Sequence, residues 1–191
     1  MINVDITFET PDIELRPLCL NDSAACHTIT KNQDLWYYFT SDLSTLESFH
    51  IWVEKAVTEM KQQKRLAFAV IYKPTQQLIG STSIANISIH DKRVEIGFTW
   101  LAKQFHGTGL NRKVKYILLQ YCFEELHCER VEFKTDVLNI PARNALKKLG
   151  ATEEGVLRSH TLMTNNRRRD TIYYSILLHE WHAIKTGFSL K

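Results

Sequence analysis

Hydrophobic positions recur at two different spacings along the chain, and the order of those spacings predicts the fold. Apolar residues at every second position predict β-strands, and apolar residues three and four positions apart predict helices. Strands are expected at residues 13–18, 66–72, 78–89, 93–101, 130–136, 152–162 and 169–178. Asn165 and Asn166 provide a hairpin turn between the last two strands.

Helical spacing is clearest in two segments, which begin near Thr45 and Thr108. Ser44-Thr45-Leu46-Glu47 has the pattern of a capping box with Ser44 as the cap. Shorter helices are expected at 21–31 and 35–39, and another at 139–149 with Gly150 as its terminating glycine. The order of elements is strand, two or three helices, three strands, helix, strand, helix and two strands.

This order predicts an α+β fold, an α/β sandwich built on one mixed, mostly antiparallel sheet of about seven strands with about four flanking helices. Pro and Gly are scattered and no linker is visible, so residues 1–191 are expected to form a single domain.

Composition excludes several classes of protein. The chain has 191 residues, of which 44% are hydrophobic and 24% charged, as in soluble globular proteins. It has no apolar run long enough for a membrane span and no secretory signal, so we expect a cytoplasmic location. A net charge of +3 does not favour a nucleic-acid partner. The four cysteines form no Cys-x-x-Cys pair, which argues against a zinc ribbon, and no metal site is expected.

The segment from Gln104 to Gly109 carries the clearest functional signal. It follows a predicted strand, opens into a predicted helix and holds Gly107 and Gly109. Glycines at such a junction let the backbone approach a ligand and turn its N–H groups outward, and the helix dipole favours an anion there. The segment lacks the Gly-Lys-Ser/Thr of a Walker A loop. Arg112 stands where a Rossmann fingerprint has its third glycine.

Together with five other segments, this loop resembles the GNAT (general N-acetyltransferase) superfamily, and within it the RimJ/RimL type. The six segments are Leu15-Arg16-Pro17-Leu18, Ile79-Gly80-Ser81, Glu95 to Trp100, Gln104 to Gly109, Asn139 to Ala151, and Glu154-Gly155 with Asp170-Thr171 and Tyr174-Ser175. The resemblance implies the GNAT fold and direct acetyl transfer from acetyl-CoA to an amine, without a covalent enzyme intermediate.

The resemblance also implies which residues contact acetyl-CoA. The backbone of Phe98, Thr99, Trp100 and Leu101 would pair with the pantetheine arm. The pyrophosphate would lie on Gln104, His106, Gly107, Thr108, Gly109, Leu110 and Asn111. Arg112, Lys113 and Lys115 would add positive charge near the adenosine phosphate, although a solvated basic face explains them too and is preferred for Lys115. Asn139 would contact the pantetheine or the sulfur, cap its helix, or do both.

Glu95 is the candidate catalytic base, because it lies on the central strand near Gly97, where the sheet can bulge. Its carboxylate would take the proton from the incoming amine, directly or through a water. The alternative is a surface glutamate paired with Arg93 or Lys92. Many RimL-like chains place a serine three residues after the asparagine as a proton donor. This chain has Ala142 there, so no acid is assigned, and catalysis rests on Glu95 and Asn139.

The acceptor side is less defined. Trp36 and Tyr37 belong to an aromatic segment that would border the acceptor, or would form a buried staple instead. His160 on the closing hairpin would face the acceptor or the solvent. Arg167-Arg168-Arg169 is either a charged turn, which we prefer, or an RNA contact. The segment from His179 to the C-terminus lacks zinc-helix spacing and should be a packing element.

The acceptor predicted from this chain is a primary amine, with a protein or peptide α-amine favoured. Polyamines, aminoglycosides and amino acids remain open as acceptors, and so does a homodimer. Two functions of other classes also remain open. One is a CoA-binding sensor without catalysis, which Ala142 favours, and the other is an RNA- or ribosome-associated module.

Overall fold

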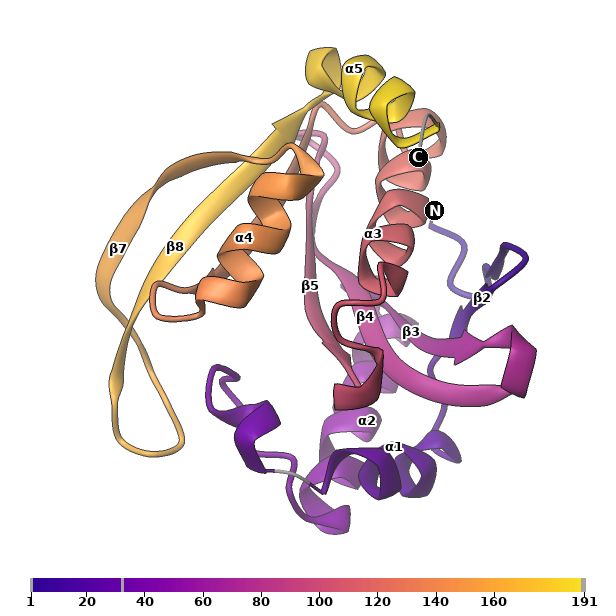
Figure 1. Ribbon diagram of the computed structural model, residues 1–191, viewed down its shortest axis with the longest axis vertical. Helices are drawn as coiled ribbons and strands as arrows, with labels where there is room; N and C mark the ends of the chain where they lie inside the picture. The colour runs from indigo at the N-terminus through magenta and orange to yellow at the C-terminus, as the bar shows by residue number, and fades with distance from the viewer. Residues whose placement is uncertain (1, 32, 190–191) are drawn as a thin grey trace.

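The computed structural model describes residues 2–31 and 33–189. Its centre is an eight-stranded sheet in the order β1-β2-β3-β4-β5-β6-β8-β7, in which only the β5–β6 pair is parallel (Figure 1). The strands are β1 (Phe8–Glu9), β2 (Ile13–Pro17), β3 (Arg65–Tyr72), β4 (Gln77–Ser88), β5 (Arg93–Leu101), β6 (Arg130–Asp136), β7 (Thr152–Leu162) and β8 (Arg168–Leu177). The predicted mixed, mostly antiparallel sheet is confirmed, with the two-residue β1 as an addition too short to show periodicity.

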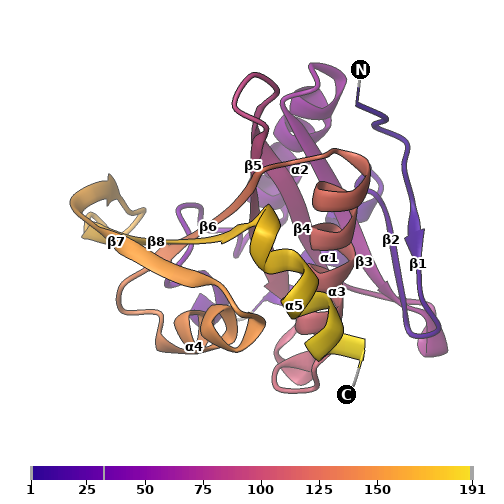
Figure 2. The same ribbon diagram turned by 90° about the horizontal axis from the view of Figure 1, so that it is seen from above.

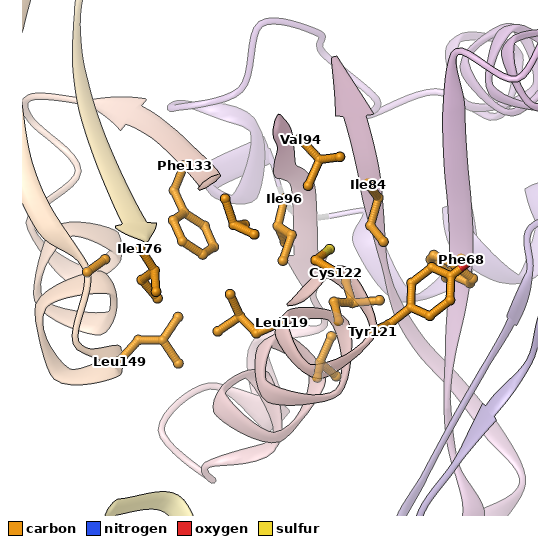
Figure 3. Close-up of a cluster of buried hydrophobic side chains, with 14 of the residues drawn as sticks. Phe68, Ile84, Val94, Ile96, Leu119, Tyr121, Cys122, Phe133, Leu149 and Ile176 are labelled. Carbon is orange, nitrogen blue, oxygen red and sulfur yellow. The ribbon is translucent and has the colours of Figure 1, made fainter. Parts of the chain in front are cut away.

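The described residues form five α-helices, which cover the two faces of the sheet: α1 (Asp22–Thr30), α2 (Leu46–Lys61), α3 (Leu110–Gln120), α4 (Ile140–Leu149) and α5 (Leu178–Ser189). Viewed from above, α3 and α5 lie on one side of the sheet and α2 on the other (Figure 2). Each face has its own core. Leu118 and Leu119 of α3 pack with Val94 and Ile96 of β5 on one side (Figure 3). On the other, Phe49 and Val53 belong to the cluster of α1 and α2.

Local sequence explains most helix ends. Asn139 caps α4, and Gly150 ends it with a φ of +101°. The cap of α2 is one residue later than predicted, because the Thr45 side chain, not that of Ser44, accepts from the Ser48 amide at 3.1 Å. The predicted helix at 35–39 is instead a 3₁₀ turn at Gln33–Trp36. The helix predicted from about 108 to 127 is α3 followed by a π-helical turn at Tyr121–Glu125.

The C-terminal segment forms α5, which packs on α3 as expected of a packing element. The Trp181 ring lies 5.4 Å from that of Tyr116 and 5.5 Å from that of Phe123. No helix among the described residues combines the length and the apolar character that crossing a bilayer requires.

The two central strands pair over a short distance only. Arg93, Val94 and Glu95 of β5 pair with Arg130, Val131 and Glu132 of β6, and the pairing ends there. The β4–β5 register shifts between Ser81 and Ser83, and Phe98 adopts a φ of +51°, so β5 bulges where the two strands separate. One edge of β5 beyond Glu95 is therefore left without a pairing strand.

Candidate functional site

The divergence of β5 and β6 opens a groove made of two adjoining cavities, each of about 450 Å³. We call them the loop cavity, which includes Gly107 and Gly109, and the carboxylate cavity, which includes Glu95. Residues of β5, α3, α4 and the segment after α1 line both cavities. The shared residues are Tyr38, Phe39, Thr99, Asn111, Asn139, Ala142 and Ala145. A ligand in the groove would thus pass from the glycine loop to Glu95 along the free edge of β5.

The glycine loop has the geometry of an anion cradle. Gly107 and Gly109 have φ values of +77° and +87°, and a Cβ at either would meet no atom within 4 Å. The space beside the loop is therefore open to a ligand. His106 Nε2 lies 2.9 Å from the Leu101 carbonyl oxygen. Gly109, the cap residue of α3, offers no side chain, and only the Leu110 amide finds a side-chain acceptor among the described residues, the Thr108 hydroxyl at 3.4 Å. The N-terminal amides of α3 can thus face an anion.

The basic residues after the loop differ from one another. The Arg112 guanidinium lies over the Phe188 ring at 4.6 Å from its centroid, and Lys113 pairs with Asp12. Lys115 is 9% exposed, so the preferred expectation of a solvated position is wrong for it. It lines the carboxylate cavity, where its amino group lies 3.5 Å from the Thr99 hydroxyl and 5.4 Å from the Phe133 ring centroid.

Burial lowers the pKa of Lys115 to about 8, from 10.5. Between those two pH values the unfolded chain binds a proton that the folded chain does not, so the residue's contribution to stability rises with pH. At pH 7 the buried ammonium should cost on the order of 3 kcal/mol. We therefore expect Lys115→Met to raise the melting temperature of the ligand-free protein at pH 7. The difference between variant and wild type should shrink toward pH 10. A pH-independent difference in thermal unfolding would contradict this origin.

Glu95 is buried, with 3% of its surface exposed. Its Oε2 accepts from the Asn86 amide at 2.6 Å and pairs with Lys134 at 2.8 Å. Oε1 lies over Gly97, where any Cβ would approach it to 2.8 Å. Gly97 therefore makes room for the carboxylate of Glu95, a requirement that the sequence does not reveal.

The alternative of a surface glutamate paired with its neighbours is wrong. Arg93 pairs instead with Asp91 and Glu132, and Lys92 with Glu129. The actual partners of Glu95, Asn86 and Lys134, come from adjacent strands. No spacing along the chain pointed to them.

Asn139 serves as a helix cap, since its Oδ1 accepts from the Ala142 amide at 3.2 Å. It also lines both cavities, so its amide nitrogen is available for the predicted second role. The cap was one of the two readings left open.

Substitution can separate the two roles of Asn139. Asn139→Asp retains the capping oxygen, so we expect near wild-type stability, whereas Asn139→Ala should lose about 1 kcal/mol. Both variants lack the amide donor and should show weaker acetyl-CoA binding or slower turnover. Thermal unfolding and steady-state kinetics measure the two effects. Full activity of Asn139→Asp would limit Asn139 to capping.

The aromatic segment divides between core and groove. Trp36 is 4% exposed and packs on Phe39, Phe49 and Trp100, so the buried reading holds for it. Tyr37 is exposed beneath Arg167. Neither is among the described residues that line the groove, whereas Tyr38 lines both cavities although the sequence analysis did not single it out. His160 lines the carboxylate cavity and is also exposed, so the structure is compatible with both the acceptor-facing and the solvent-facing expectation.

The three consecutive arginines do not form the expected charged turn. Arg167 pairs with Asp136 at 2.5 Å and Arg169 is 6% exposed, so two of the three side chains are held within the protein. Arg168 is exposed and donates to the Ser159 side chain at 2.9 Å. Among the described residues, no cluster of three or more His, Cys, Asp or Glu could hold a metal ion.

The mixed sheet thus opens beside a glycine loop, and a buried carboxylate lies at the opening. Residues 12–152 match the family model of the acetyltransferase (GNAT) domain. The chain therefore belongs to the GNAT N-acetyltransferases, which confirms the predicted family, fold and enzyme class.

Known proteins of this family resemble the chain closely. YdaF of Bacillus subtilis, whose name assigns it provisionally to the ribosomal N-acetyltransferases, is 29% identical over 154 residues, covering 78% of this chain and 80% of YdaF. A GCN5-related N-acetyltransferase from Brucella melitensis superposes with a TM-score of 0.89 at 25% identity, covering 97% and 85% of the two chains. The ribosomal-protein-S5-alanine acetyltransferase of Vibrio fischeri has a TM-score of 0.77 at 20% identity, covering 93% of this chain and 99% of that one, and shares the fold.

Proposed function

We propose that this N-acetyltransferase transfers the acetyl group of acetyl-CoA directly to the α-amine of a protein or peptide, as RimJ/RimL-type enzymes do. The observation that carries the proposal is the continuity of the groove. The glycine loop, the free edge of β5 and buried Glu95 follow one another along it.

The residues present fit acetyl-CoA. The open space beside Gly107 and Gly109 suits a pyrophosphate, and the amides of residues 106–110 would hold it. The backbone of Phe98 to Leu101 lies on the unpaired edge of β5 and would bind the pantetheine amides as a neighbouring strand does. Asn111 contributes a buried Oδ1 without a partner among the described residues, as expected where a ligand supplies the donor. When bound, acetyl-CoA supplies an activated acyl carbon and a thiolate leaving group.

Glu95 would accept the proton of the attacking amine, directly or through a water. Lys134 and Asn86 fix the carboxylate and leave Oε1 above Gly97 on the cavity side of β5. Holding donor and amine in one groove supplies much of the remaining acceleration, because it makes the reaction effectively unimolecular. Ala142 cannot donate a proton to the departing thiolate, so that proton would come from another group of the groove, such as Asn139 or a tyrosine, or from water.

An α-amine suits this site better than a lysine ε-amine. Its pKa is about 8, against about 10 for lysine, so far more of it is already neutral at pH 7. The name of the Bacillus subtilis relative supports a protein acceptor of the ribosomal kind. Such an enzyme would act in the cytoplasm, with or without forming a homodimer.

Competition between two peptides tests the proposal. One peptide has a free N-terminus and no lysine, and the other is blocked at its N-terminus and carries one lysine. Acetylation followed by mass spectrometry should be faster for the free N-terminus. Faster acetylation of the blocked peptide would contradict the α-amine preference.

A second candidate, a sensor that binds acetyl-CoA without catalysis, is favoured by Ala142. Thermal stabilisation by acetyl-CoA with no turnover of any amine would support that candidate instead.

A further inference from the structure

Arg169 and Thr171 of β8 place unused hydrogen-bonding groups in the wall of the carboxylate cavity. They are 6% and 1% exposed, and both line the cavity. The Nε of Arg169 and the Oγ1 of Thr171 are buried and have no hydrogen-bond partner among the described residues. Buried polar groups in folded proteins are nearly always paired, so a pair of unpaired ones facing a cavity points to a ligand.

Strand register places these residues on the same face of the sheet as Glu95. Across the β6–β8 pair, Lys134 lies opposite Tyr173 and Asp136 opposite Thr171. Side chains alternate between faces, so Arg169 and Thr171 share the face of Lys134, which reaches Glu95 across the opening. The predicted base and the two unpaired groups therefore belong to one side of the groove.

The ionisable groups beside Arg169 are paired with one another. Lys134 pairs with Glu95, and Arg167 pairs with Asp136. Arg169 forms no ion pair with any described residue, although Asp136 and Glu95 act on it electrostatically from a longer range. Burial accordingly lowers the pKa of Arg169 from its usual value.

A buried guanidinium without a partner is costly, because the desolvation of its charge is not offset by a close anion. Nothing in its packing requires a charge, since it neither caps an element nor bridges two. The cost is explained if a bound anion completes the pair. The planar guanidinium fits a carboxylate, whose two oxygens can accept its parallel N–H donors.

We propose that Arg169, assisted by the Thr171 hydroxyl, binds a carboxylate carried by the acceptor while the acceptor's amine faces Glu95. The inference rests on the proposed acetyl transfer to an α-amine and restricts the acceptor to amines that carry a carboxylate. That carboxylate is either the α-carboxylate of a free amino acid or a side-chain carboxylate at the start of a peptide. His160 lines the same cavity from β7 and offers a further donor.

Acceptors that differ only in a carboxylate test the proposal. One pair is alanine and alaninamide. The other is the peptides Asp-Ala-amide and Asn-Ala-amide, which have a free N-terminus and an amidated C-terminus. One of the two pairs carries its carboxylate where the natural acceptor does. In that pair, wild-type kcat/KM should favour the acid over the amide by about 10- to 100-fold, the value of a charge-assisted contact. Arg169→Gln should reduce this ratio to near one, mainly through KM, and Thr171→Val should reduce it partly. Taking the ratio between enzymes cancels the different basicities of the amines.

Two further variants separate binding from folding. Arg158→Gln removes an exposed arginine of the neighbouring strand and should keep the wild-type ratio. Arg169→Lys keeps the positive charge but lacks the planar guanidinium, and it should retain part of the preference for the acid. Because Arg169 has no partner to lose, Arg169→Gln should melt at or above the wild-type temperature without ligand. A marked fall would indicate a structural role and overturn the proposal.

The remaining outcomes are also decisive. Equal use of acid and amide by the wild type, or a preference that survives Arg169→Gln, would overturn the inference and leave the acetyltransferase function intact. So would a stronger preference for a phosphorylated amine such as phosphoserine. Failure to acetylate any amine would contradict the proposed function itself. The inference would then be judged by thermal shift of the CoA-bound protein, in which added N-acetylaspartate should further stabilise the wild type but not Arg169→Gln.

Discussion

Gly109→Ala should weaken acetyl-CoA binding by at least about 10-fold, since each lost contact between an amide and a phosphate is worth about 1.5–3 kcal/mol. Gly109 has a φ of +87°, and its missing Cβ would point into open space beside the loop. An alanine there places a methyl group where the pyrophosphate is expected and disfavours the left-handed backbone. The measurement is the stabilisation of the protein against heat over an acetyl-CoA titration.

The control for this experiment is Gly150→Ala. Gly150 also has a left-handed backbone, with a φ of +101°, but it ends α4 outside the groove. Both variants should lose about 1–2 kcal/mol of stability through backbone strain. Gly150→Ala should lose somewhat more, because its Cβ would lie 3.0 Å from the Ile184 side chain. Only Gly109→Ala should lose the response to acetyl-CoA. A full response in Gly109→Ala would remove the loop from the donor site.

Glu95→Gln should lower turnover by roughly 10²- to 10⁴-fold, the usual contribution of a general base. The glutamine amide has nearly the same shape as the Glu95 carboxylate, so the affinity for acetyl-CoA should change little. The deficit should shrink as pH rises, because more of the amine is then neutral without help. Rates measured between pH 6.5 and pH 9.5, with saturating acetyl-CoA, give the profile.

Glu132→Gln is the matched control. Glu132 lies beside Glu95 in the parallel register and is also ion-paired, but it does not line the groove among the described residues. Removing the negative charge of Glu132 should leave kcat within a few-fold of the wild-type value. Equal turnover of Glu95→Gln and wild type at neutral pH would reassign Glu95 to a structural role.

Much of the fold follows from local sequence. The strand from Arg93 to Leu101 and that from Arg130 to Asp136 have the predicted bounds, because their alternation is long and regular. Asn139 and Gly150 mark the ends of α4 through their own side-chain and backbone chemistry. The π-helical turn after Gln120 was missed, because its apolar spacing continues that of α3.

The site was less predictable, because its key contacts join strands that are distant in the chain. Glu95 was identified from its strand, but its pairing with Lys134 depends on how β5 and β6 separate. Burial of Lys115 and Arg169 reverses the expectation for charged side chains in basic runs. Local sequence favours exposure for such residues, and only the three-dimensional packing shows which of them face a cavity.

Hydrogen–deuterium exchange with and without acetyl-CoA tests the central claim most directly, namely that the donor lies along the free edge of β5 and on the glycine loop. Acetyl-CoA should slow exchange in residues 97–101 and 106–112, and should leave β1–β2 and the β7–β8 turn unchanged. Protection confined to other segments, or none at saturating acetyl-CoA, would contradict the account.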